Sequence, residues 1–121
     1  MSTGNLHIKR VYDTAQKTDG CRILVDRVWP RGMSKQKLQA DLWLRDAAPS
    51  TELRRWFGHD PDRWDEFRRR YFAELRDNPD AVAAIRDRLD AGTVTLLYSA
   101  KDTRHNQAAA LQEYLCPARE S

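Results

Sequence analysis

The chain has 121 residues, which fits a single domain, and its hydrophobic content of 40% is sufficient for a core. Lysine and arginine number 21 against 18 aspartate and glutamate residues, so the formal net charge is only +3 at pH 7. Because the acidic residues are mixed through the same segments, this excess does not by itself indicate a nucleic-acid-binding protein. No segment approaches the roughly 20 apolar residues of a membrane span, and we expect no membrane contact.

The amino-terminal residues lack a basic segment followed by an apolar one, so we expect a cytoplasmic protein without a secretory signal. Cys21 and Cys116 lie far apart in the sequence, and in a reducing compartment we expect free thiols. The three histidines share no metal-ligand spacing, and the glycine-rich phosphate-binding motifs are missing. We therefore predict neither a metal ion nor a cofactor.

Two strands are expected near the amino terminus. Residues 6–11 alternate between apolar and polar side chains, which indicates a half-buried strand. Residues 21–25 are apolar except for Arg22, which is typical of a central strand buried on both faces. The polar residues 13–20 between them predict a loop. Residues 29–32 must turn, because proline removes a backbone donor and glycine permits unusual backbone angles.

The middle of the chain carries helix signals. Ser34 is expected to cap a short helix that ends near Leu38, and residues 42–44 are a candidate third strand. A second helix is predicted to begin after Ser50, whose hydroxyl suits an N-cap, and to end at Gly58.

Two longer helices are predicted from a repeated device, in which a capping residue precedes a proline at the first helical position. Asp60 and Asn78 are the two capping residues. Residues 93–98 form the clearest strand, and Asp102 or Thr103 is expected to cap a last helix. The core-facing positions of these helices are spaced three or four residues apart: Trp64, Phe67, Tyr71, Leu75, Val82, Ile85, Leu89, Ala108, Leu111 and Leu115.

Strands that are separated by helices pair in parallel through crossover connections. We therefore predict an α/β fold, a small three-layer-like sandwich with a short, mainly parallel sheet of three to four strands flanked by helices. Residues 6–115 are expected to form one domain, with residues 1–5 and 116–121 as flexible termini.

Charged side chains follow two of the predicted strands, and in a parallel sheet these strand ends open at one edge together with the amino end of the last helix. Free backbone N–H groups and cationic side chains at such an edge attract anions. We expect Asp26 or His105 to move a proton there, as candidate catalytic residues. The candidate binding residues are Arg27, Trp29, Arg31, Lys101, Asp102, Arg104 and Asn106.

Structural roles are the alternative for each of these residues. An ion pair would account for Asp26 and Arg27, a helix cap for Asp102, loop hydrogen bonds for His105 and Asn106, and packing for Trp29.

Six short motifs resemble those of a known family. They are RVYD at 10–13, LVDRVWPRG at 24–32, APSTELR at 48–54, WFGHDP at 56–61, LYSAKD at 97–102 and HN at 105–106. Together they resemble the YeaO-like family, small bacterial proteins classed as a domain of unknown function. The resemblance spans about residues 6–115. It implies a single-domain α/β cytoplasmic protein and carries no established catalytic activity.

Three functions follow as hypotheses. The first is binding of an anionic small molecule at the carboxyl edge of the sheet, with or without its chemical transformation. The second is a nucleic-acid-binding or transcription-related protein that uses the basic face of the long helix around Arg68, Arg69 and Arg70, although we favour a solvated face for this run. The third is an interaction module, which would expose a broad apolar patch. The oligomeric state is left open.

Overall fold

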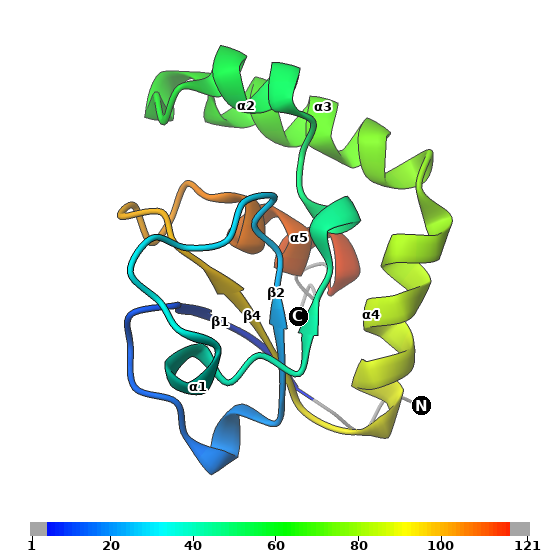
Figure 1. Ribbon diagram of the computed structural model, residues 1–121. Helices are drawn as coiled ribbons and strands as arrows, with labels where there is room; N and C mark the ends of the chain where they lie inside the picture. Colours follow the sequence, from blue (N-terminus) through cyan, green and yellow to red (C-terminus); the bar gives the residue numbers. More distant parts are fainter. Residues whose placement is uncertain (1–4, 117–121) are drawn as a thin grey trace.

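Four parallel strands form a sheet in the order β1-β4-β2-β3 (Figure 1). In the computed structural model, which describes residues 5–116, they are β1 (Leu6–Arg10), β2 (Cys21–Leu24), β3 (Leu42–Trp43) and β4 (Val94–Tyr98). The predicted α/β fold with a parallel sheet of three to four strands is confirmed. Of the termini that we expected to be flexible, residues 1–4 and 117–121 lie outside the described part of the chain.

Each strand is one residue shorter than predicted. In β1, β2 and β3 the omitted residue still belongs to the hydrogen-bond ladder at the carboxyl end, because the backbone N–H groups of Val11, Val25 and Leu44 donate to the neighbouring strands. The predicted apolar runs therefore include the residues at which the chain leaves the sheet.

The last strand in the sequence lies in the middle of the sheet. β4 pairs with β1 on one side and with β2 on the other, and all five of its residues are buried. The register places Leu24 of β2 beside Leu97 of β4. Because parallel strands point the same way, the loops that follow β2 and β4 leave the sheet at one edge.

Five helices flank the sheet within residues 5–116: α1 (Lys35–Leu38), α2 (Thr51–Phe57), α3 (Trp64–Arg76), α4 (Pro79–Ala91) and α5 (Gln107–Leu115). Short 3-10 turns occupy Lys17–Asp19, Arg45–Ala47 and Pro61–Arg63. The helix α1 lies on one side of the sheet, whereas α3, α4 and α5 lie on the other (Figure 1). The predicted layered arrangement is thus present.

Alternating side chains of β2 and β4 separate two hydrophobic layers. Ile23 and Leu96 belong to the larger layer, which the helices α3 to α5 complete. Leu24 and Leu97 face the other way and pack with Leu38 of α1 in the smaller layer. The sheet is therefore buried on both faces, which explains why its central strands are almost continuously apolar.

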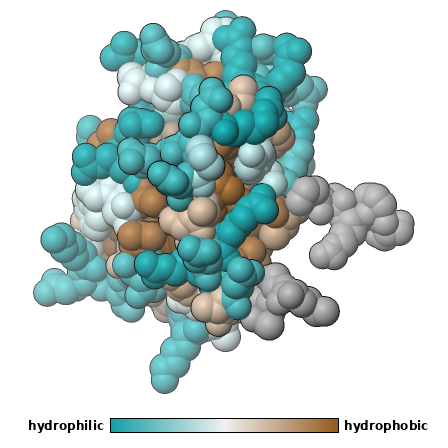
Figure 2. Space-filling view, turned by 90° about the vertical axis from the view of Figure 1, so that its right-hand side faces the viewer, coloured by the Kyte–Doolittle hydropathy of each residue, from teal (hydrophilic) through white to brown (hydrophobic). Residues whose placement is uncertain are grey.

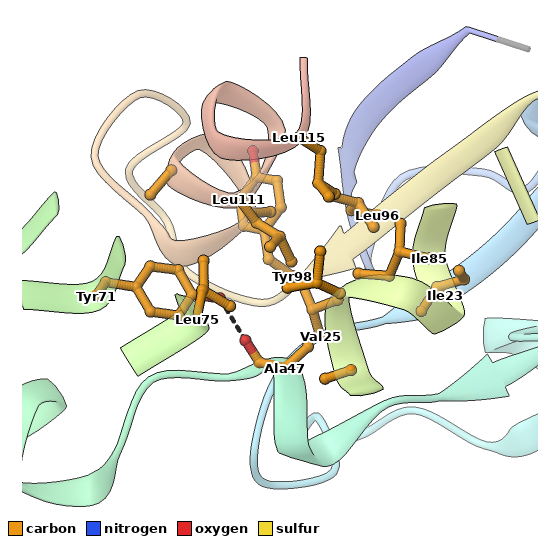
Figure 3. Close-up of a cluster of buried hydrophobic side chains, with 14 of the residues drawn as sticks. Ile23, Val25, Ala47, Tyr71, Leu75, Ile85, Leu96, Tyr98, Leu111 and Leu115 are labelled. Atoms are coloured by element: carbon orange, nitrogen blue, oxygen red, sulfur yellow. Dashed lines mark hydrogen bonds between the residues drawn. The ribbon is translucent and has the colours of Figure 1, made fainter. Parts of the chain in front are cut away.

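The larger layer is the main core of the protein (Figure 3). The predicted helix stripes are confirmed in it, although Trp64 is only partly buried. Tyr71 is fully enclosed, and its hydroxyl donates to the carbonyl oxygen of Ala47. That bond satisfies the one polar atom of the ring and fixes the segment before α2 against α3.

The helix caps are correct in part. Ser34 and Ser50 accept hydrogen bonds from the backbone N–H groups of Lys37 and Leu53, so both predicted caps are confirmed. Asp60 caps the 3-10 turn that leads into α3.

One predicted cap is wrong, and another has the predicted position without a side-chain capping bond. Asn106, not Asp102 or Thr103, caps α5, because its side-chain oxygen accepts from the N–H of Ala109 at 2.8 Å. Asn78 occupies the N-cap position of α4 and Pro79 the first helical position, as predicted, but the Asn78 side chain makes no capping hydrogen bond, and its amide donates to the carbonyl oxygen of Asp46.

The surface is mostly polar. On the face shown in Figure 2, hydrophilic side chains project around a middle area of hydrophobic residues. Among the described residues, Tyr12 and Val28 are the large hydrophobic side chains that are exposed, so the structure gives little support to a broad apolar docking patch. No helix in residues 5–116 has the length and the apolar composition that a bilayer crossing requires.

A buried ionic cluster lies near the amino ends of the strands. The segment 13–20, predicted as a loop, contains a 3-10 turn that brings Asp19 between Lys9 and Arg22. Burial would raise the pKa of Asp19, but hydrogen bonds from these two cations and from the Gln16 backbone outweigh it and lower the pKa. The charge of Arg22, the one charged residue of β2, is thereby compensated by Asp19.

We expect Asp19→Asn to lower the free energy of unfolding by about 3 kcal/mol, because it leaves a buried cation without its counter-charge. Urea-induced unfolding measures this loss. Asp87→Asn on the exposed face of α4 is the matched control and should change stability by less than about 0.5 kcal/mol. An equal effect of both substitutions would contradict the structural role of the cluster.

Candidate functional site

A cleft of about 970 Å³ opens at the edge of the sheet where β2 and β4 end. Its lining comes from the loop that follows β2, the loop that follows β4, and the segment 48–59 that includes α2. The structure therefore brings the two charged strand ends to one hollow. Six of the nine predicted site residues line it: Asp26, Arg27, Trp29, Arg31, Lys101 and Asp102.

Asp26 lies where β2 meets the cleft, and only 7% of the residue is exposed. Its carboxylate accepts a hydrogen bond from the backbone N–H of Ser99 at 3.1 Å and another from the side-chain amide of Gln107. Burial raises the pKa of the Asp26 carboxyl, although these donors and the nearby Arg54 oppose the shift. The carboxylate thus joins β2, β4 and α5 at a single point.

Arg27 does not pair with its neighbour Asp26. Its guanidinium donates to the carbonyl oxygens of Pro49 and Ala48, both at 3.2 Å. The side chain therefore holds the segment before α2 against the loop that follows β2. It lines the cleft as part of the wall, with two of its donors already used.

Trp29 both packs and lines the cleft. Its ring meets Trp43 edge-on at 5.3 Å between centroids, and its indole N–H donates to the carbonyl oxygen of Met33 at 2.6 Å. The indole N–H of Trp43 in turn donates to the backbone oxygen of Asp26 at 2.8 Å. The two tryptophans therefore fix the turn that carries the cations of this loop.

Asp102 forms a tight turn after β4. One oxygen of its carboxylate accepts from the backbone N–H groups of Arg104 and His105, both at 2.9 Å, and the other meets Nδ1 of His105 at 2.9 Å. The backbone N–H of His105, followed by that of Arg104 and by the imidazole, lowers the pKa of Asp102 to about 2. This carboxylate is ionised and fully engaged.

Three predicted site residues lie outside the lining of the cleft. Asn106 is buried, caps α5, and donates to the carbonyl oxygen of Asp102 at 2.9 Å. His105 is held by Asp102 and packs against the ring of Trp64 at 5.3 Å. Arg104 is exposed on the same turn. The structural alternatives considered for Asn106 and His105 describe their contacts well.

Sequence reasoning missed the contribution of α2 to the cleft. Arg54 and Arg55 both line it, together with Thr51. The sequence shows the arginines on this short helix, whose buried face consists of Leu53 and Phe57, with Arg54 next to that face. Without the tertiary structure, however, nothing indicates that α2 faces the strand ends.

His59 was not among the predicted site residues, although its place between two helices allows it to reach a site. It lines the cleft from the turn after α2, and its φ of 59° lies in the left-handed region. This conformation costs a non-glycine residue roughly 1 kcal/mol or more. The preceding residue, Gly58, also has a left-handed backbone, with a φ of 55°.

Two residues at the end of β1 hold the rims of the cleft. The guanidinium of Arg10 donates to the carbonyl oxygen of Ala100 at 2.9 Å, in the loop that follows β4. The hydroxyl of Tyr12 donates to the carbonyl oxygen of Arg31 at 3.0 Å, in the loop that follows β2. The motif at 10–13 thus positions the motifs at 24–32 and 97–102.

The cations of the cleft differ from the arginines of the long helix. The α3 arginines are neutralised at the surface, where Arg69 and Arg70 both pair with Glu66 and Arg68 pairs with Asp65 and Glu113. By contrast, no salt bridge joins any described residue to these side chains of the cleft: Arg31, Arg54, Arg55 and Lys101.

The described residues offer no evident metal ligands, because no three His, Cys, Asp or Glu side chains among them are grouped closely enough to hold an ion.

Comparison with known proteins identifies the family. The model of the inactive DUF488-N3 subclade matches residues 5–121. The chain belongs to this subclade. YeaO of Escherichia coli (strain K12) is 44% identical over 111 residues, which cover 92% of this chain and 96% of YeaO. Rv3073c of Mycobacterium tuberculosis (strain H37Rv) is 39% identical over 91% of this chain and 92% of its own length. Both relatives are named uncharacterized proteins, and no solved structure matches the chain.

The resemblance to the YeaO-like family is therefore confirmed. Four of the six motifs on which it rested contribute residues to the cleft, namely those at 24–32, 48–54, 56–61 and 97–102. In this member of the DUF488-N3 subclade, segments far apart in the sequence meet at one hollow.

We expect the Asp102 turn to stabilise the fold in a pH-dependent manner. Because the pKa of Asp102 falls from 3.8 to about 2 on folding, its contribution is present above pH 3.8 and is lost as the pH falls towards 2. Asp102→Asn should therefore unfold at lower urea concentration than the natural chain at pH 6, and the difference should narrow between pH 4 and pH 2. Asp87→Asn should show no such narrowing, and a constant difference for Asp102→Asn would contradict the assignment.

Proposed function

We propose that the protein binds an anionic small molecule in the cleft at the carboxyl edge of its sheet. One observation carries this proposal: four cationic side chains from three segments line the cleft and form no salt bridge within residues 5–116. Guanidinium and ammonium groups that lack a protein counter-ion at a shared hollow are suited to phosphate or carboxylate.

The shape of the cleft supports a small molecule. Its volume of about 970 Å³ is in the range of pockets for compact ligands. Apolar side chains, including those of Phe57 and Phe67, form part of the lining and would exclude water from one side of the ligand. A hollow that combines cations with an apolar wall favours an organic anion over a simple inorganic one.

Binding is better supported than catalysis. His105 is one of the two residues considered for proton transfer, and it is engaged with Asp102 and Trp64 outside the cleft lining. The family to which the chain belongs is described as an inactive subclade. We therefore propose a cytoplasmic protein that holds its ligand without turnover, and we assign His105 to the support of the Asp102 turn.

A nucleic-acid interface on α3 receives less support, because its central arginines are paired with carboxylates of the same surface. Counterion release from a nucleic acid would first require those pairs to break.

The test is binding to a panel of anions: inorganic phosphate, ethyl phosphate, phenyl phosphate, propionate and benzoate. We expect at least one of them to raise the melting temperature, because a ligand that binds only the native state stabilises it. Arg54→Gln and Lys101→Gln should each weaken binding by about tenfold, the scale of one charge-assisted hydrogen bond.

Arg86→Gln is the control, because this arginine is exposed on α4 and absent from the cleft lining. It should leave the binding constants unchanged. If no anion stabilises the protein, or if Arg86→Gln weakens binding as much as Arg54→Gln does, the proposed function is wrong.

A further inference from the structure

We propose that the ligand of the cleft is a zwitterion, an anion that also carries a protonated amine, and that the amine donates to the carboxylate of Asp26. This inference rests on the proposed function and specifies the chemical class of the molecule. The phosphate or carboxylate would meet the cations of α2 and of the two strand loops, and the ammonium group would meet the acid at the sheet edge.

The first support is the incomplete compensation of Asp26. It is among the most buried charged residues of the described chain, yet it forms no salt bridge with any of those residues. Asp19, which is buried to a similar extent, pairs directly with two cations. A buried carboxylate without a direct counter-ion is costly, and a cationic donor would relieve that cost.

The second support is the unused hydrogen-bonding capacity of Asp26. An ionised carboxylate offers about four lone-pair positions, and three protein donors address it: the backbone N–H of Ser99, the side chain of Ser99 and the side-chain amide of Gln107. Since Asp26 is part of the cleft lining, a ligand can reach the remaining acceptor positions. These donors hold the carboxylate in place and leave about one of its acceptor positions for a ligand.

The third support is the contrast with Asp102, the other carboxylate of the cleft. Asp102 already receives two backbone N–H bonds and one contact with an imidazole nitrogen. Its charge is used within its own turn, so it has little left to offer a ligand. The acceptor role in the cleft therefore falls to Asp26.

A ligand with only negative groups would face an unfavourable interaction with this carboxylate. The same hollow holds five basic side chains and two acidic ones, so it presents both signs of charge. A molecule with separated charges complements both, whereas a simple phosphate or carboxylate satisfies only the cations.

The experiment compares three phosphate monoesters that differ at one group. O-Phosphoethanolamine carries a protonated amine, phosphocholine carries a positive nitrogen without N–H donors, and ethyl phosphate carries no amine. Binding is followed by two-dimensional ¹H–¹⁵N NMR, which is suited to weak ligands. The backbone amide of Ser99 and the side-chain amide of Gln107 report on the immediate surroundings of Asp26.

We expect O-phosphoethanolamine to bind at least about tenfold more tightly than either of the other two esters, and to shift both reporter signals. β-Alanine and propionate form the corresponding carboxylate pair, and they show whether the anionic group is a carboxylate. In Asp26→Asn, O-phosphoethanolamine and ethyl phosphate should bind with about equal affinity, whereas Asp87→Asn should retain the preference for O-phosphoethanolamine. If Asp26→Asn does not fold, the comparison of ligands on the natural chain and the two reporter signals still decide.

The possible failures are distinguishable. If neither the phosphates nor the carboxylates of this series change the NMR signal of any residue of the cleft, the proposed function fails and this inference fails with it. If ethyl phosphate or phosphocholine binds as tightly as O-phosphoethanolamine, and propionate as tightly as β-alanine, anion binding stands and the zwitterion inference is overturned. Retention of the amine preference in a folded Asp26→Asn variant would likewise overturn the assignment to Asp26.

Discussion

The carboxylate of Asp26 is the contact on which the functional edge of the protein depends. It follows β2, accepts from the loop after β4 through Ser99, and accepts from α5 through Gln107. Its own backbone oxygen accepts from Trp43 of β3. One buried residue thus connects three strands and a helix at the edge where the cleft opens, so the two loops keep a fixed relation to each other.

The protein treats its charges in three different ways, and the differences give the cleft its character. At the other end of the strands, Asp19 is buried and paired with cations on both sides. On α3, arginines and glutamates neutralise one another at the surface, where each pair adds little to stability. In the cleft, four cationic side chains form no salt bridge with any described carboxylate. Separation of charge in a partly apolar hollow is the arrangement that favours a ligand.

Supporting contacts keep the cleft in shape. Arg10 and Tyr12 at the end of β1 hold one rim each, and Arg27 holds the segment before α2. All three donate to backbone carbonyl oxygens, so they fix the path of the chain around the cleft. Motifs that look like binding residues in the sequence are therefore divided between those that shape the hollow and those that face it.

The sequence by itself determined the strands, most of the helices and the parallel α/β class, because apolar periodicity, prolines and capping residues are local signals. It also indicated that Asp26, Arg31 and Lys101 would share an edge, since parallel strands end on the same side. Local signals failed at α5, where Asp102 or Thr103 was the predicted cap and the structure has Asn106 in that role.

The tertiary structure alone decided which charges meet. Arg54 and Arg55 reach the cleft because α2 packs against α3 and turns over the strand ends, and no spacing in the sequence records that long-range contact. In the same way, Asp26 is separated from its neighbour Arg27 because each finds partners on a segment distant in the sequence. Side chains select partners by proximity in the folded chain, and the sequence gives that proximity only where the secondary structure is regular.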